Sequence, residues 1–129
     1  MKRVTGVGGV FLKSKDPAKL YRWYEEHLGV GGSPESPAIF HWREKEDPEK
    51  EGMTIWSIIP EASTYFDPSA SNFMINYRVA DLDALLESLR AEGVPIDEKR
   101  EQSEYGKFAW ITDLDGNRIE LWEPPPGTS

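Results

Sequence analysis

The chain contains no cysteine, which excludes a disulfide framework and a thiolate metal site. Basic residues are few: 15 Lys and Arg stand against 23 Asp and Glu, a formal net charge of −8. This charge argues against nucleic acid and anionic membranes as partners, because both would be repelled. Long apolar runs are also missing, and none approaches the roughly 18 residues of a membrane span. Glycines interrupt the first apolar stretch and no small-residue cleavage site follows, so we expect no secretory signal and a cytoplasmic location.

Aromatic side chains are plentiful by comparison. The 129 residues correspond to one domain, and a chain of this size buries roughly two thirds of its unfolded surface. Aromatic residues make up 12% of the chain, and five of them are Trp. So many rings in a small domain require a core, a pocket or an interface to hold them.

Two parts of the chain repeat one order of predicted elements. A strand at 4–13 precedes a helix that begins at Asp16-Pro17 and ends at Gly29. A strand at 73–79 precedes a second helix, capped by Asp81 and ended by Gly93. Further strands are expected after each helix, at 38–42, 53–59, 107–112 and 118–123, with a short one at 94–96 left open. The simplest explanation is an internal duplication within the single domain 1–129, with a first module at 4–60, a linker at 61–72 and a second module at 73–124.

The most specific motif closes the second module. Tyr105-Gly106 is followed at 113–122 by Asp-Leu-Asp-Gly-Asn-Arg-Ile-Glu-Leu-Trp. Together with the strand and helix at 10–29, this motif resembles the glyoxalase / bleomycin-resistance / extradiol dioxygenase (vicinal oxygen chelate) superfamily, with Leu114 in place of the usual proline. The resemblance covers nearly the whole chain. It implies an α+β fold of two βαβββ modules, whose curved mixed sheets form a cleft.

The same resemblance implies four positions for metal ligands, on the first and last strands of each module. Metal-using members carry His, Gln or Glu there. Counting from the helix-capping aspartates gives Gly9 and Met74, and the last strands give Trp56 and Glu120. One carboxylate does not hold a divalent cation in water, and a thioether is a poor ligand for hard ions. We therefore expect no metal and no other cofactor.

Alternation along the strands predicts what else lines the cleft, because every second side chain points to the same face. The result is an aromatic cleft with a few polar side chains. Phe108 and Trp110 share one face of their strand, and the sequence does not decide whether that face lines the cleft. Glu120 is a candidate catalytic base if the protein is an enzyme, or else the partner of an arginine in a buried ion pair. His41 is a second candidate base, although a lone histidine is more often structural. The candidate ligand-binding residues are Phe11, Trp56, Met74, Asn76, Arg78, Arg118 and Trp122.

Three functions follow from these features. The preferred one is binding of a small aromatic or partly apolar molecule in a metal-free cleft, by a protein that we expect to be a homodimer. The first alternative is a metal-dependent glyoxalase-type lyase, isomerase or dioxygenase that uses Glu120. The second alternative is a dimeric interaction protein without a ligand.

Overall fold

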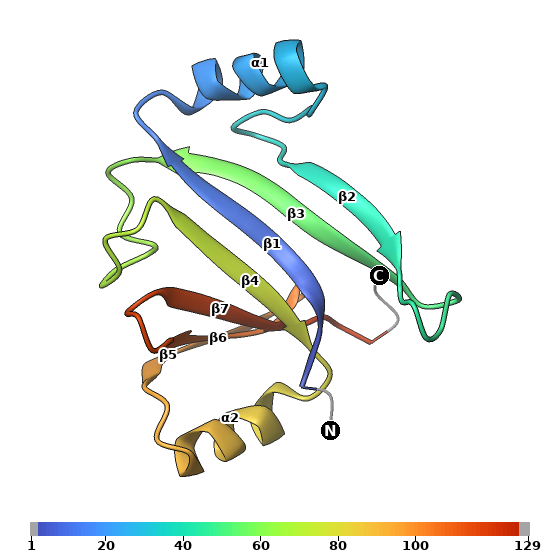
Figure 1. Ribbon diagram of the computed structural model, residues 1–129, viewed down its shortest axis with the longest axis vertical. Coiled ribbons are helices and arrows are strands. Elements are labelled where there is room, and N and C mark those ends of the chain that lie inside the picture. Colours follow the sequence, from blue (N-terminus) through green and yellow to red (C-terminus); the bar gives the residue numbers. More distant parts are fainter. Residues whose placement is uncertain (1–2, 127–129) are drawn as a thin grey trace.

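The computed structural model describes residues 3–126. Within this range the chain forms seven strands and two helices (Figure 1). Their order is β1 (Val4–Ser14), α1 (Pro17–Leu28), β2 (Ala38–Arg43), β3 (Glu51–Pro60), β4 (Phe73–Val79), α2 (Leu82–Ala91), β5 (Ile96–Ser103), β6 (Gly106–Thr112) and β7 (Arg118–Glu123).

Both helices begin at the predicted aspartates. The Asp16 side chain accepts a hydrogen bond from the backbone N–H of Lys19 at 3.2 Å, and Asp81 caps α2 in the same way. Gly29 ends α1 in the left-handed conformation, at φ 70°, which glycine adopts without steric cost. Neither described helix is long and apolar enough to cross a membrane.

The strands form one sheet in the order β2-β3-β1-β4-β7-β6-β5. Each half contains one parallel pair, β1 with β3 and β4 with β7, and antiparallel pairing of β1 with β4 joins the halves edge to edge. The predicted α+β fold class is therefore confirmed, with the two sheets continuous as one curved surface (Figure 1).

The two repeats differ in length. After its helix, the second repeat has three strands and the first has two. The segment between α1 and β2 forms only an isolated bridge between Ser33 and Ser36. The strand left open at 94–96 is β5, which begins at Ile96 and is mostly exposed. Its charged sequence suits the edge of a sheet, where charges prevent pairing with other chains.

Both helices pack on one face of this sheet. Val10 and Leu12 lie in the cluster under α1, and Tyr77 lies in the cluster under α2. Val10 is paired with Ile75, which shares a face with Tyr77 because side chains alternate along a strand. The helices thus cover the outer face at opposite ends of the long axis (Figure 1), and the inner face is left for the side chains between them.

The segment between the modules packs against the sheet. Residues 61–72 contain turns and no strand, but Phe66 is fully buried and packs in a third cluster with Met74 and Trp110. Trp110 is opposite Glu120 in the pairing of β6 with β7, so this cluster lies on the inner face. The loop therefore covers one part of the concave surface and leaves the rest accessible.

Candidate functional site

A pocket of about 490 Å³ opens on the concave face. Strands of both repeats contribute to its wall, so it is formed only when the two halves are joined. Its lining is Gly8, Phe11, Ile39, Met53, Ile55, Tyr65, Asn76, Glu104, Tyr105, Phe108, Glu120, Trp122 and Pro125. Most of these side chains are apolar or aromatic, and few polar groups interrupt them. A pocket of this size and composition is typical of small-molecule sites.

Glu120 supplies the buried charge of this pocket and is 2% exposed. Asn76 Nδ2 donates to its Oε1 at 2.6 Å, Trp110 Nε1 donates to its Oε2 at 3.0 Å, and the Tyr65 hydroxyl also donates to Oε2. Strand register explains the first two contacts, because Asn76 and Trp110 are the residues opposite Glu120 on β4 and β6. Three chain donors therefore converge on one carboxylate.

Burial raises the pKa of the Glu120 carboxyl above its ordinary value, because removal from water disfavours the charged form. The hydrogen bonds from Tyr65, Asn76 and Trp110 oppose this rise, and the negative charge of Glu101 adds to it. Burial is the largest of these effects. The carboxyl thus retains a proton at higher pH than an exposed glutamate does.

Tyr65 is not among the predicted site residues, because it lies in the segment predicted to be a linker. Burial and the neighbouring Glu120 carboxylate raise the pKa of its hydroxyl, so it stays protonated and donates. Its ring meets Phe11 edge-on, with the ring centroids 6.1 Å apart. A sequence signal did exist, since Tyr65 and Phe66 are two adjacent large aromatics in an otherwise small and polar segment.

Two aromatic rings form a stacked wall of the pocket. Phe108 and Trp122 are nearly parallel, at 6° between planes, with centroids 6.0 Å apart. Trp122 Nε1 donates to the Tyr105 carbonyl at 2.7 Å, which fixes the orientation of the indole. Phe108 and Trp110 both face inward, since they are paired with Trp122 and Glu120. The facing that the sequence left open is thereby determined.

Four of the predicted site residues meet at the pocket: Phe11, Asn76, Glu120 and Trp122 all line it. Met74 is on the same face but is 1% exposed in the cluster with Phe66. It lies outside the pocket lining because the loop at 61–72 covers it.

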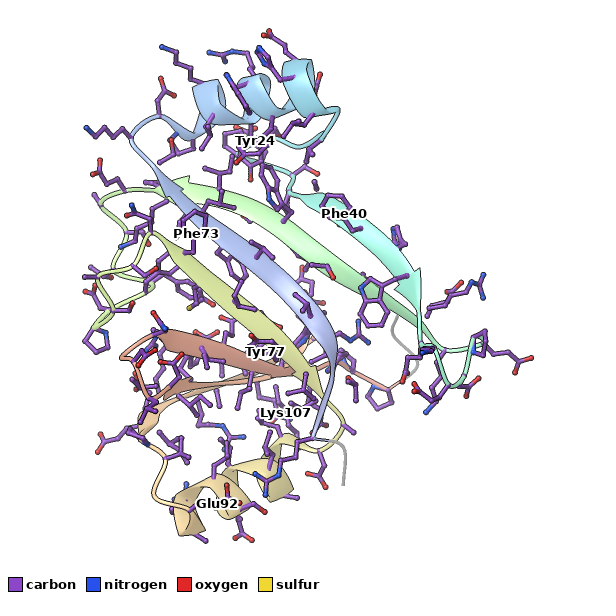
Figure 2. All side chains as sticks on the ribbon, in the orientation of Figure 1. Tyr24, Phe40, Phe73, Tyr77, Glu92 and Lys107 are labelled. Carbon is purple, nitrogen blue, oxygen red and sulfur yellow. The ribbon has the colours of Figure 1, made fainter. Side chains whose placement is uncertain are left out.

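The prediction that Trp56 lines the cleft is wrong. Its ring packs on the helix side, with centroids 4.7 Å from Tyr24 and 5.8 Å from Tyr21. Figure 2 shows Tyr24 between α1 and the sheet. The prediction aligned Pro60 with Pro124, but β3 includes Pro60 whereas β7 ends at Glu123. A shift of one residue moves a side chain to the opposite face.

Met53 and Ile55 take the place predicted for Trp56 and line the pocket. The strand register also shows which residue of β3 corresponds to Glu120. Ser57 is opposite Phe11, as Glu120 is opposite Asn76 in the other repeat. The first repeat thus carries no carboxylate at the corresponding position.

The two arginines support the pocket from outside its lining. Arg78 lies between two rings, with its guanidinium carbon 5.4 Å from the Trp42 centroid and 5.3 Å from that of Trp122. Arg118 forms an ion pair with Asp97 at 2.7 Å. Within residues 3–126 neither arginine pairs with Glu120, so the ion pair considered for this carboxylate is not formed.

His41 is placed away from the pocket. It lies on β2 at the edge of the sheet, is exposed, and is not part of the pocket lining. It therefore does not join Glu120 in one site.

The donor set around Glu120 does not fit a divalent metal. Its neighbours on the strands are the amide of Asn76 and the indole of Trp110, and both donate hydrogen bonds to it. A metal ligand must offer a lone pair instead. The indole has none to offer, and the amide oxygen of Asn76 lies against Gly8 while its nitrogen faces the carboxylate. Residues 3–126 hold no group of three or more His, Cys, Asp or Glu side chains that could bind an ion.

Comparison with known proteins agrees with this fold. The sequence model of the Glyoxalase/Bleomycin resistance protein/Dioxygenase superfamily matches residues 6–121, and the chain belongs to this superfamily. No curated protein matches the chain.

Several solved structures share the fold. Methylmalonyl-CoA epimerase from Mycobacterium tuberculosis is 24% identical over 98% of this chain and 92% of its own, with a TM-score of 0.61. A methylmalonyl-CoA epimerase in complex with methylmalonyl-CoA and NH4+ is 15% identical over 98% and 99%, with a TM-score of 0.70. A superfamily member from Vibrio splendidus 12B01 is 16% identical over 91% and 97%, with a TM-score of 0.57. At these identities the similarity concerns the fold alone.

Proposed function

We propose that this protein binds a small, largely apolar, ring-bearing molecule in the concave pocket, without a resident metal. The observation that carries the proposal is the pocket itself. It has a volume of about 490 Å³, and its wall is mostly aliphatic and aromatic around one buried carboxylate. The hydrogen bonds from Asn76, Trp110 and Tyr65 to Glu120 support the metal-free form, because they occupy the carboxylate with protein donors.

The apolar wall supplies the main part of the binding free energy expected for such a ligand. Burying roughly 200 Å² of apolar ligand surface contributes about 5 kcal/mol at 25 cal/mol per Å². The cost of association reduces this contribution, so burial alone should give a simple ring compound a Kd of roughly a millimolar or weaker. Stacking on the Trp122–Phe108 pair adds geometric preference for a flat ring.

A second candidate function is proton transfer by Glu120, because its raised pKa suits a general acid or base. The related epimerase is described with methylmalonyl-CoA. Such an anionic thioester suits this pocket poorly, because none of the described lining residues is Lys, Arg or His. Incubation with methylmalonyl-CoA in D₂O tests this candidate: deuterium incorporation that Glu120→Gln abolishes would favour the enzyme.

Isothermal titration with 1-naphthylmethanol and 1-naphthylmethylamine tests the binding function. Ile39 and Phe40 provide a matched pair of variants, because they are adjacent and 47% and 48% exposed. Ile39 lines the pocket and Phe40 points to the opposite face; Figure 2 labels Phe40 on β2. Ile39→Asn should weaken binding by about tenfold, and Phe40→Asn should leave it unchanged. Lack of binding by both compounds, or equal loss in both variants, would contradict the proposal.

A further inference from the structure

The charged groups that line the pocket have one sign. Glu120 lies in its wall and Glu104 lies on its exposed part, and none of the described lining residues is basic. A carboxylate accepts about four hydrogen bonds, and Glu120 receives three from the chain. One acceptor position thus remains for a ligand.

The buried side-chain donors of the pocket wall are already engaged. The Tyr65 hydroxyl donates to Glu120, and the Trp122 indole donates to the Tyr105 carbonyl. The amide nitrogen of Asn76 is turned to the carboxylate, which leaves its amide oxygen buried against Gly8 without a partner in the described part of the chain. A ligand that accepts hydrogen bonds therefore finds few donors here, whereas a ligand that donates them finds acceptors.

Two cations near the pocket form ion pairs with acids other than Glu120. Lys99 lies 4.8 Å from the Trp110 ring centroid but pairs with Glu101 at 3.4 Å. Arg118 also lies over Trp110, at 5.4 Å, and pairs with Asp97.

Arg78 is a third cation near the pocket, held between two indole rings and acted on by the charge of Glu44. Within residues 3–126, none of these three cations forms an ion pair with Glu120. Its charge is therefore not compensated by a direct counter-ion from this part of the chain.

We infer that the ligand is a cation, namely a protonated amine on an apolar or aromatic body, with its ammonium group at Glu120. The inference rests on the proposed function and specifies the ligand class for the same pocket. Aromatic faces favour the same charge, because the ring quadrupole attracts an ammonium group. The rings that line the pocket are those of Phe11, Tyr65, Tyr105, Phe108 and Trp122.

Three ligands of one shape test the inference at neutral pH: 1-naphthylmethylamine, 1-naphthylmethanol and 1-naphthoate. Isothermal titration should show the amine binding at least about tenfold more tightly than the alcohol, and the carboxylate binding most weakly. If the alcohol equals the amine, or the carboxylate exceeds it, the cation inference fails while the proposed function stands. If none of the three binds, the proposed function fails as well.

Matched variants locate the charge that is responsible. Glu120→Gln removes the carboxylate in the pocket, and Glu87→Gln removes an exposed carboxylate on α2, so both change the net charge equally. Glu120→Gln should reduce the amine affinity by about tenfold and the alcohol affinity much less, because the alcohol loses no charge interaction. Retained alcohol binding also shows that the pocket is intact. Glu87→Gln should change neither. An unchanged amine affinity in Glu120→Gln, or equal loss of amine and alcohol, would overturn the inference.

Discussion

Replacing the buried carboxylate should stabilise the protein at neutral pH, because Glu120→Gln keeps the shape of the side chain and removes its charge. The glutamine oxygen can accept from Tyr65 and Trp110, as the carboxylate does. Its amide nitrogen needs an acceptor, and the unpartnered amide oxygen of Asn76 can supply one if that side chain turns over. We therefore expect Glu120→Gln and the wild type to differ by no more than about 1 kcal/mol in acid.

The difference in free energy of unfolding between Glu120→Gln and the wild type should increase with pH. Since burial raises the pKa of Glu120 in the folded state above its ordinary value of 4.5, the unfolded chain loses this proton first. Wild-type stability then falls, relative to Glu120→Gln, by about 1.4 kcal/mol per pH unit until the folded carboxyl also ionises. The loss starts near pH 4.5 and is complete above the folded-state pKa.

Urea unfolding followed by Trp fluorescence, repeated between pH 4 and pH 8, measures this stability difference from the urea concentrations at the transition midpoints. Glu87→Gln serves as the control, because its side chain is exposed on α2. Its stability relative to the wild type should not change with pH. The reasoning would be refuted if Glu120→Gln lost stability relative to the wild type as the pH rose. That result would mean that the three hydrogen bonds outweigh burial and lower the pKa.

Three further substitutions test the packing and the hydrogen bonds. Tyr65→Phe removes one donor from the Glu120 carboxylate, so at pH 8 it should destabilise the protein by about 1.5–3 kcal/mol in urea unfolding. A variant as stable as the wild type would show that this bond contributes nothing. Leu82→Ala, at a fully buried position on α2, should cost about 2–5 kcal/mol. Leu114→Ala, at a fully exposed turn position, should stay within about 0.5 kcal/mol. Gly106→Ala should cost about 2 kcal/mol or more in thermal unfolding, because this residue has φ 115° and an added Cβ would lie 2.3 Å from a carbonyl oxygen of β7; a melting temperature equal to the wild type would contradict that strain.

Local rules were enough to predict the helices. An aspartate cap and a closing glycine define α1, and they act within a few residues of themselves. Alternation, started from the positions that the resemblance implies on each strand, placed Phe11, Asn76 and Trp122 on the face that lines the pocket. The resemblance to the superfamily then gave the arrangement of the two repeats, which no single segment contains.

The sequence-based prediction was wrong or incomplete where the position of a side chain depends on distant parts of the chain. The face of Trp56 depends on whether Pro60 belongs to β3, and the pairing with β1 decides this. Tyr65 reaches Glu120 across 55 positions in the sequence, so no local pattern marks the contact. The pair of Arg118 with Asp97 depends on β5, a charged edge strand whose sequence lacks the apolar alternation by which strands are usually recognised.

Metal dependence of binding tests the central claim most directly. The naphthyl ligand of higher affinity would be titrated into protein as purified, into the same protein after dialysis against a chelator, and into that protein with Zn²⁺, Mn²⁺ or Ni²⁺ returned. If the pocket binds through its rings and the Glu120 carboxylate alone, the three affinities will agree. Loss of binding on chelation, restored by one of these ions, would contradict the account and favour a metal site at Glu120.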